Sequence, residues 1–189
     1  MIRPASPPGR RREPDTVDLE ISVVDEQSDH PIDVSRWQDL ARQVLEVEGI
    51  ASAAELTVLF VDEPAMARLN LTFMGEDGPT DVLVFPLDGE DAPLVGRTPG
   101  SSPSGPDGEP GAGQPLLLGD VVICPAVAAR NAPDHAGPYH AGTYDGEIAL
   151  LVVHGILHVL GMDHATPTDD QVMAARQREL LGRCHRSPR

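Results

Sequence analysis

The stretch YDGEIALLVVHGILHVLGMDH, residues 144–164, joins a long apolar run to three of the chain's seven histidines. From 144 to 160 the apolar residues lie almost all round a helical projection, which is typical of a helix buried on every side. Gly161 follows the run, and a glycine free to adopt positive φ commonly ends a helix. The stretch therefore predicts a central, buried helix with polar side chains at its C-terminal end.

Strand and helix patterns alternate in the residues around this helix. Alternating or continuous apolar runs predict strands at 17–24, 55–62, 81–87 and 115–125. Helical patterns predict helices at 33–48, 63–74 and 168–182 and a short helix at 126–132. The segment 135–142 is predicted to be a loop. About four strands mixed with helices indicate a small α+β or α/β sheet with helices packed on it.

Capping residues refine the helix boundaries. Asp33 or Ser35 is expected to cap the first helix, because short polar side chains accept hydrogen bonds from the free N–H groups there. The last helix is expected to begin with Thr168 as its cap and to stop at Gly182.

Composition divides the chain into one domain with appendages. Residues 1–16 are rich in proline and arginine and are expected to be a disordered tail, and 183–189 form a C-terminal tail. The domain then spans 17–182, and its length is enough to bury one hydrophobic core. Within it, the Gly-, Pro- and Ser-rich segment 88–115 is predicted to be a mobile loop.

Charge and cysteine content restrict the class of protein. The net charge is −16 and all 14 basic residues are arginine, whereas nucleic-acid-binding proteins usually have a basic face. This counts against RNA or DNA as a partner unless local arginines or a metal meet the polyanion. The N-terminus lacks the apolar segment of a secretory signal, and the run 148–162 is too short to span a bilayer. We expect a cytoplasmic protein with no membrane partner and with reduced thiols at Cys124 and Cys184.

Three histidines have the spacing of a metal site. His154 and His158 are four residues apart on the predicted helix, so their rings project from the same face. The turn at Gly161 lets His164 reach the same ion from outside the helix. Three neutral imidazoles are a typical set of catalytic zinc ligands, with the fourth position left for water. We therefore predict one zinc ion, although such a site also accepts nickel, cobalt or iron.

Two alternatives to a catalytic metal stay open at this point. Buried histidines can be ordinary core residues, but two on one apolar helix would each need a polar partner. A structural zinc would close its coordination with a fourth protein ligand, often a thiolate, which Cys124 or Cys184 could supply.

The spacing is also that of the long zinc-protease signature, H-E-x-x-H-x-x-G-x-x-H. The second position, where a peptidase carries its glutamate base, is Gly155 in this chain. Peptide hydrolysis at zinc relies on that glutamate, so a metalloprotease is a weaker interpretation.

Other polar residues near the signature are weaker candidates. Asp163 follows the signature's glycine turn and is predicted to orient a ligand imidazole from behind, a role for which Glu147, two turns before His154, is a second candidate. Capping or turn formation is an equally plausible role for Asp163, and a structural or electrostatic role is favoured for Glu147. The four remaining histidines are expected to be solvated and not ligands; they are His30, His135, His140 and His185.

A second polar cluster begins the predicted strand in GPTDVLVFP, residues 78–86. Thr80 and Asp81 can serve as turn residues there. The functional interpretation is that this strand edge lines the metal cleft, with Asp81 and Thr80 as candidate catalytic groups and Asp81 as a proton acceptor.

Taken together, these stretches resemble the YbeY family of bacterial rRNA maturation factors. HGILHVLGMDH matches every fixed position of a hallmark similar to H-G-x-L-H-x-x-G-x-D-H. LNLTFMGEDGPTDVLVFP, 69–86, is similar to the family's L-N-x-x-(aromatic)-R-x-x-D-x-P-T-D-V-L-S-F-P, and the family's G-D-(I/V)-x-I strand appears at 119–123. The resemblance covers roughly 17–182 in the same order.

The resemblance implies a single α+β domain with a small mixed four-stranded sheet packed with about five helices. It also implies a zinc ion on His154, His158 and His164. The implied activity is that of a metal-dependent, single-strand-specific endoribonuclease in 3′-end maturation of small-subunit rRNA, with a part in ribosome quality control. Members of the family are linked to small-subunit components and to a ribosome-associated GTPase.

Two positions depart from the family pattern. The arginine expected after the aromatic residue is Met74, and the serine of the strand motif is Val84. The family arginine is expected to meet phosphate, and Arg68, two turns earlier on the predicted helix, is a candidate substitute for substrate binding. The competing hypotheses are therefore a zinc-dependent endoribonuclease, a non-catalytic assembly factor stabilised by zinc, and, less favoured, a metalloprotease.

Overall fold

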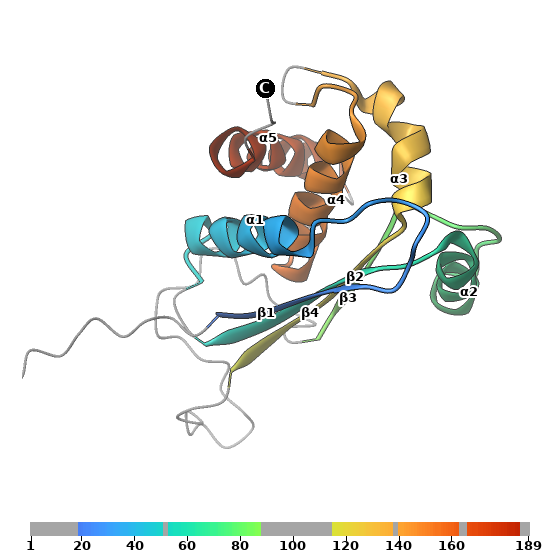
Figure 1. Cartoon of the computed structure of the whole chain (residues 1–189). Coiled ribbons are helices and arrows are strands. Elements are labelled where there is room, and N and C mark those ends of the chain that lie inside the picture. The colour runs from blue at the N-terminus through green and yellow to red at the C-terminus, as the bar shows by residue number, and fades with distance from the viewer. Residues whose placement is uncertain (1–18, 51–52, 88–114, 138–139, 163–165, 186–189) are drawn as a thin grey trace, which may run out of the picture.

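A mixed four-stranded sheet with helices packed on it forms the domain in the computed structural model, which describes residues 19–50, 53–87, 115–137, 140–162 and 166–185 (Figure 1). The strands are β1 (Leu19–Asp25), β2 (Ala54–Phe60), β3 (Val82–Pro86) and β4 (Leu116–Ile123). The helices are α1 (Val34–Val47), α2 (Glu63–Phe73), α3 (Pro125–Asn131), α4 (Tyr144–Val159) and α5 (Pro167–Cys184), with a 3₁₀ turn at Ala132–His135. The predicted α+β class, the four strands and the five helices are confirmed.

The strands lie in the order β1-β2-β4-β3. β1 pairs in parallel with β2, and β2 in parallel with β4. β3 is antiparallel to β4 and forms an edge of the sheet. Because parallel neighbours need a crossover connection, α1 links β1 to β2 across one face.

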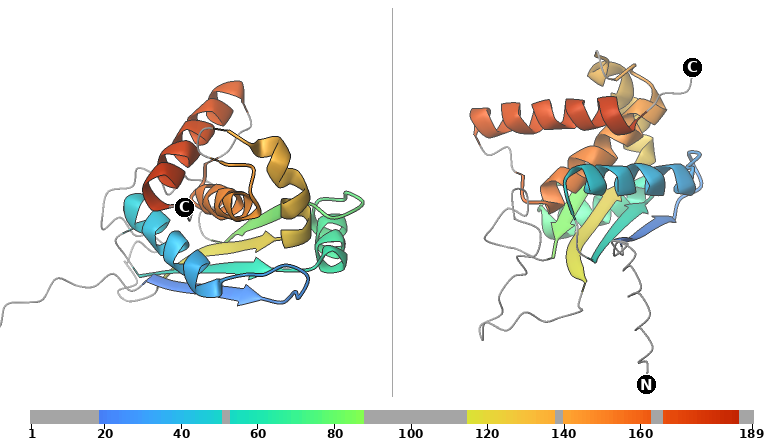
Figure 2. Two further views of the ribbon diagram at one scale, coloured as in Figure 1. Left: turned by 45° about the horizontal axis from the view of Figure 1, so that its top comes forward. Right: turned by 90° about the vertical axis from the view of Figure 1, so that its left-hand side faces the viewer.

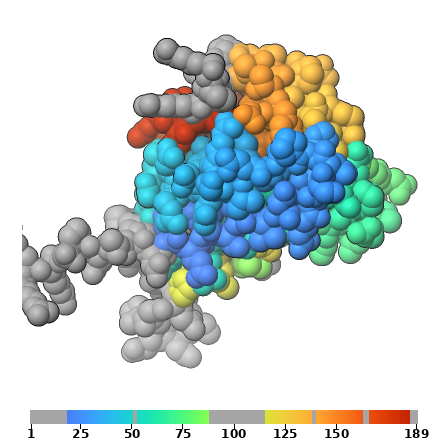
Figure 3. Space-filling view, in the orientation of Figure 1, coloured from blue at the N-terminus to red at the C-terminus, as the bar shows by residue number. Residues whose placement is uncertain are grey.

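The central helix α4 is buried between the sheet and two other helices. Eleven of its sixteen residues are buried, as the apolar run predicts. The views in Figure 2 show α1, α4 and α5 on one side of the sheet, and the space-filling view shows α1 on the surface of this side, next to α4 (Figure 3). Trp37, Leu40, Val44 and Leu45 of α1 belong to the same apolar cluster as α4. A smaller cluster packs Met66 of α2 near Leu83 and Val122.

Local hydrogen bonds confirm one predicted cap and correct another. Asp33 Oδ1 accepts a hydrogen bond from Arg36 N at 3.2 Å, which caps α1. At α5, however, the cap is Thr166 and not Thr168, since Thr166 Oγ1 accepts from Asp169 N at 3.2 Å. Pro167 disfavours a helical conformation at the residue before it and fits the first helical position itself.

The predicted stop of the last helix at Gly182 is also wrong. α5 continues to Cys184, and His185 N donates to Leu181 O at 3.0 Å. Leu180 and Leu181 are buried in the core cluster and Cys184 packs against it. This packing offsets the roughly 1 kcal/mol that a glycine costs inside a helix.

Several expectations concern residues beyond the described ones. The tail 1–16, nearly all of the loop 88–115 and most of the tail 183–189 lie outside the described ranges. In the part of the chain that is described, no helix is both long and apolar enough to cross a membrane. Cys124 and Cys184 are both free thiols, as expected, and burial raises the pKa of each.

Candidate metal centre

Two of the three predicted ligands meet at the C-terminal part of α4. The rings of His154 and His158 are nearly perpendicular, at 79°, with centroids 4.6 Å apart. Their Nε2 atoms lie 3.1 Å from each other. Two nitrogens each about 2.0–2.1 Å from one ion, at this separation, subtend an angle of about 100°, near the tetrahedral value that zinc prefers. The separation of these two of the three predicted donors therefore fits a zinc ion.

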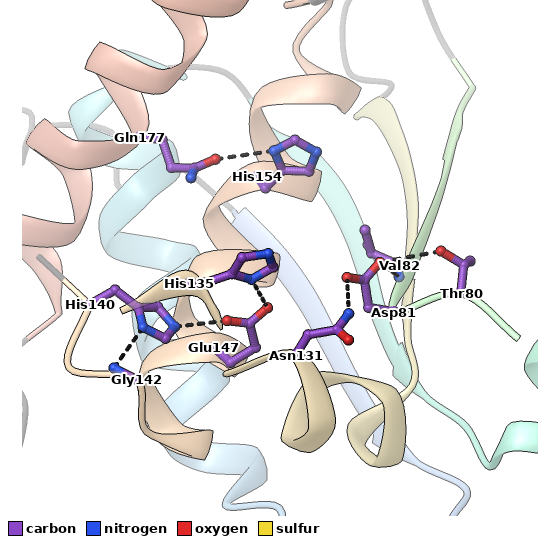
Figure 4. A network of polar contacts seen from close by, with 10 residues as sticks. All are labelled: Thr80, Asp81, Val82, Asn131, His135, His140, Gly142, Glu147, His154 and Gln177. Carbon is purple, nitrogen blue, oxygen red and sulfur yellow. Dashed lines mark hydrogen bonds and ion pairs between the residues drawn. The ribbon is translucent and has the colours of Figure 1, made fainter. Parts of the chain in front are cut away.

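The other nitrogen of His154 is also engaged. Gln177 reaches from α5 and places its Oε1 3.1 Å from His154 Nδ1 (Figure 4). The sequence-based interpretation missed Gln177. A signal was present, since Gln177 is four residues after the buried Met173 and three before the buried Leu180, on the apolar face of α5. A polar residue on that face needs a partner inside the protein.

A tight turn follows the two histidines. Gly161 has a φ of 83°, its N–H donates to His158 O at 2.8 Å, and Met162 N donates to Leu157 O at 2.9 Å. This pair of bonds is a Schellman motif, which reverses the chain as predicted. Asp163 and His164 lie in 163–165, outside the described residues, so the third ligand and the orienting role of Asp163 stay predictions. Within the described ranges alone, no cluster of three metal-ligating side chains is found.

Gly155 is the point where α4 contacts the sheet. A Cβ built on Gly155 would overlap Val121 Cγ1 and lie 2.9 Å from Val121 Cγ2. Val121 is a fully buried residue of β4. A glutamate at position 155 would therefore project into β4 and not toward the histidine pair, which counts against the metalloprotease interpretation.

Glu147 contacts a different pair of histidines. Its carboxylate is fully buried, with Oε1 2.8 Å from His135 Nδ1 and Oε2 2.8 Å from His140 Nε2 (Figure 4). Gly142 N donates to His140 Nδ1 at 2.9 Å, and the approach of His140 Nε2 to Oε2 is an ion-pair contact without hydrogen-bond geometry. These contacts favour the structural interpretation of Glu147 over the predicted role behind the zinc ligands. A buried carboxylate needs such partners to offset its desolvation.

The expectation that His140 is solvated is wrong, because only 6% of its surface is exposed. His135 is about half exposed but pairs with Glu147. His30 packs on Tyr144, and His185 stacks on Trp37, where burial lowers the pKa of His185. Sequence spacing did not indicate these contacts because each joins segments that are apart in the chain.

Asp81 and Thr80 lie in a hydrogen-bond network at the start of β3. Asp81 Oδ1 accepts from Val82 N at 2.9 Å and from Thr80 Oγ1 at 3.2 Å. Asp81 Oδ2 accepts from Asn131 Nδ2 at 3.0 Å, which ties β3 to the end of α3 (Figure 4). These hydrogen bonds agree with the interpretation of Thr80 and Asp81 as turn residues. Their catalytic role stays a prediction.

The basic side chains near α2 are exposed or paired. Arg68 is exposed on α2, and Met74, at the C-terminal end of that helix, is 50% exposed. Arg130 forms a two-pronged ion pair with Glu63, at 2.6 and 3.0 Å, which lowers the pKa of Glu63. Arg68 is thus accessible for a phosphate contact, whereas Arg130 already has an acidic partner.

The fold and the paired histidines define a small α+β protein with a candidate metal centre on its central helix. The family model described as "Endoribonuclease YbeY" matches residues 22–185. The chain therefore belongs to the YbeY family. The expected resemblance is confirmed across nearly all of the predicted domain.

Curated relatives agree with this assignment. The Endoribonuclease YbeY of Thermobifida fusca is 45% identical over 169 residues, covering 89% of this chain and 96% of the relative. That of Kineococcus radiotolerans is 45% identical over 166 residues, covering 86% and 85%. The solution structure of TM1509 from Thermotoga maritima has the same fold, with a TM-score of 0.52, 24% identity, and coverage of 85% and 86%.

Proposed function

We propose that this protein is a zinc-dependent, single-strand-specific endoribonuclease that acts in 3′-end maturation of small-subunit rRNA and in ribosome quality control. The observation that carries the proposal is the convergence of His154 and His158, with Nε2 atoms 3.1 Å apart, in a chain of this family. The relatives' name, Endoribonuclease YbeY, supports the reaction class. RNA is accordingly the proposed substrate, with small-subunit components and a ribosome-associated GTPase as proposed partners.

The proposed metal ligands are His154, His158 and His164. When bound, zinc supplies Lewis-acid chemistry: it stabilises negative charge at the scissile phosphate and makes water a stronger nucleophile near neutral pH. The protein's part is to keep both described imidazoles neutral and aimed at one point. RNA also carries its own 2′-hydroxyl next to the phosphate, and attack by that group would make a strong protein base at the position of Gly155 less necessary.

The residues proposed to contact RNA lie on α2 and at the start of β3. Arg68 is proposed to bind a phosphate, because it is exposed on α2, the helix that ends at Met74, in the place of the family arginine. Asp81 and Thr80 are proposed to line the substrate path at the start of β3. With a net charge of −16, binding depends on these local contacts, and a single arginine–phosphate contact predicts only a shallow fall in affinity as salt is raised.

The experiment uses zinc-loaded full-length protein and two labelled RNAs, one single-stranded and one duplex. The wild type is expected to cut the single strand and to leave the duplex intact. His158→Ala removes one of the two converging nitrogens and is expected to lower the cleavage rate at least about 100-fold, in line with the loss of a metal ligand. His30→Ala, which removes an imidazole that packs on Tyr144, is the matched control and should cut at the wild-type rate. Undiminished cleavage by His158→Ala would refute the proposal.

The second candidate is a non-catalytic assembly factor stabilised by zinc. The observation that favours it is Met74, which leaves an exposed apolar side chain where the family carries an arginine. In that case the wild type would bind zinc and small ribosomal subunits but cut neither RNA. Restoring the arginine with Met74→Arg separates the two cases, since it should raise cleavage only in an enzyme.

A further inference from the structure

Gln177 is the one side chain of α5 whose described hydrogen bond reaches a proposed metal ligand. Its Oε1 lies 3.1 Å from His154 Nδ1, and Figure 4 shows the amide pointing from α5 toward the imidazole on α4. Both side chains are half-buried. The contact therefore sits behind the imidazole, on the side away from His158.

The chemistry of the contact decides where the proton of His154 lies. An amide oxygen only accepts hydrogen bonds, so Nδ1 must donate and must carry the proton. In a neutral imidazole Nε2 is then the unprotonated nitrogen, which is the form that binds a metal. This nitrogen is the one that lies 3.1 Å from Nε2 of His158, at the point where both imidazoles converge.

The acceptor is held in place by the packing of α5. The residue before it, Arg176, donates through Nε to Glu48 Oε1 at 2.7 Å, at the C-terminal end of α1. The side chain of Glu48 is only 3% exposed, and Met173, Leu180 and Leu181 of α5 are buried in the core. The position of Gln177 is therefore set by α1 and the core, independently of any ligand.

We propose that Gln177 is a positioning residue that fixes His154 as the Nδ1–H tautomer and aims its Nε2 at the point shared with His158. The inference deepens the proposed function, on which its metal-binding consequence rests. Groups that accept the second N–H of a metal-bound histidine raise metal affinity, and losing one typically weakens binding about 10- to 100-fold. In this protein that group comes from another helix.

The test compares Gln177→Met with Gln177→Glu. Methionine keeps the length of the side chain and removes the acceptor, whereas glutamate keeps an acceptor oxygen. Imidazole ¹⁵N shifts in the zinc-free protein report the tautomer, and competition with a chelator reports zinc affinity. We expect Gln177→Met to lose the Nδ1–H preference and to bind zinc roughly 10- to 100-fold more weakly, and Gln177→Glu to retain both. Arg178→Ala, at an exposed neighbouring position, is the control for altering α5.

Two results would overturn the inference. One is a wild-type His154 that carries its proton on Nε2, a result that needs no variant to fold. The other is Gln177→Met with an unchanged tautomer and unchanged zinc affinity, even if its melting temperature falls, since Gln177 would then serve packing alone. A wild type that shows the expected Gln177 dependence but cuts no RNA would support this inference and refute the proposed function.

Discussion

Gly155 shows how a single position joins the fold to the site. It lies between the two histidines of α4 and contacts Val121 of β4, where a Cβ would overlap the valine methyl groups. The absence of a side chain lets the helix approach the sheet closely, and this approach places the histidine-bearing turn beside β4. Gly155 therefore stands where a peptidase has its glutamate base, and it is also required for the close packing of α4 on β4.

Gly155→Ala is expected to destabilise the protein. Alanine normally stabilises a helix interior by about 1 kcal/mol relative to glycine. Overpacking a closed core costs about 1–3 kcal/mol, and this effect should dominate because Val121 is fully buried. Urea denaturation of Gly155→Ala, Val121→Ala and the double variant measures the coupling between the two positions. An equal cost of Gly155→Ala in both backgrounds would show that Val121 is not the cause.

The start of α5 is a boundary that differs from expectation. The sequence Thr166-Pro167-Thr168 offers two possible caps. Proline resolves the choice, since it fits the first turn and keeps the preceding residue extended; Thr166 has a ψ of 156°. The hydroxyl of Thr166 also donates to Asp169 Oδ2 at 2.6 Å, which closes the cap from both sides.

Alanine substitutions distinguish the two threonines. Thr166→Ala removes the observed cap and is expected to lower the free energy of unfolding by about 1 kcal/mol. Thr168→Ala changes an exposed position inside the helix and should stay within about 0.5 kcal/mol of wild type. Thermal melts of both variants check the prediction, and the reverse order of effects would restore Thr168 as the cap.

Helices and strands were predictable from the sequence where a periodic pattern of apolar residues marks them. The apolar run of α4 and the alternation of β2 predict both elements to within one or two residues, because burial on one or both faces imposes the period. The pairing of His154 with His158 follows from helical spacing alone. The contacts of Gln177 and Glu147 were not predictable in the same way, since each joins a helix to a segment that only the tertiary fold brings near.

At the scale of the whole molecule, the core consists of apolar side chains from most of the helices and strands. Its larger apolar cluster takes buried side chains from β1, β2 and β4 and from α1, α3, α4 and α5, and Val82 and Val84 of β3 pack against it. The two described histidines lie only half-buried beside this cluster. A zinc ion at the site would therefore add stability to a domain that is already folded, unlike the structural zinc of a small finger.

Removing metal is expected to leave the fold intact. EDTA should leave the far- and near-ultraviolet circular dichroism unchanged while it lowers the melting temperature. Zinc at about 100 times its dissociation constant should stabilise the protein by about 2.7 kcal/mol, and this stabilisation is what EDTA removes. Loss of the near-ultraviolet signal in EDTA would instead assign zinc a structural role.

The pairing of β3 with β4 has a practical consequence for the segment between them. Pro86 lies opposite Gly119 in the ladder, and Leu87 N donates to Leu118 O at 3.2 Å, so the chain leaves β3 and enters β4 at the same end of the strand pair. The entropy of closing a loop between fixed ends grows only slowly, by about 0.6 kcal/mol for each doubling of length. Residues 88–114 are therefore a natural place to graft an affinity tag or a fluorophore, which would report on the protein in cells without disturbing the strand pairing or the histidine-bearing helix.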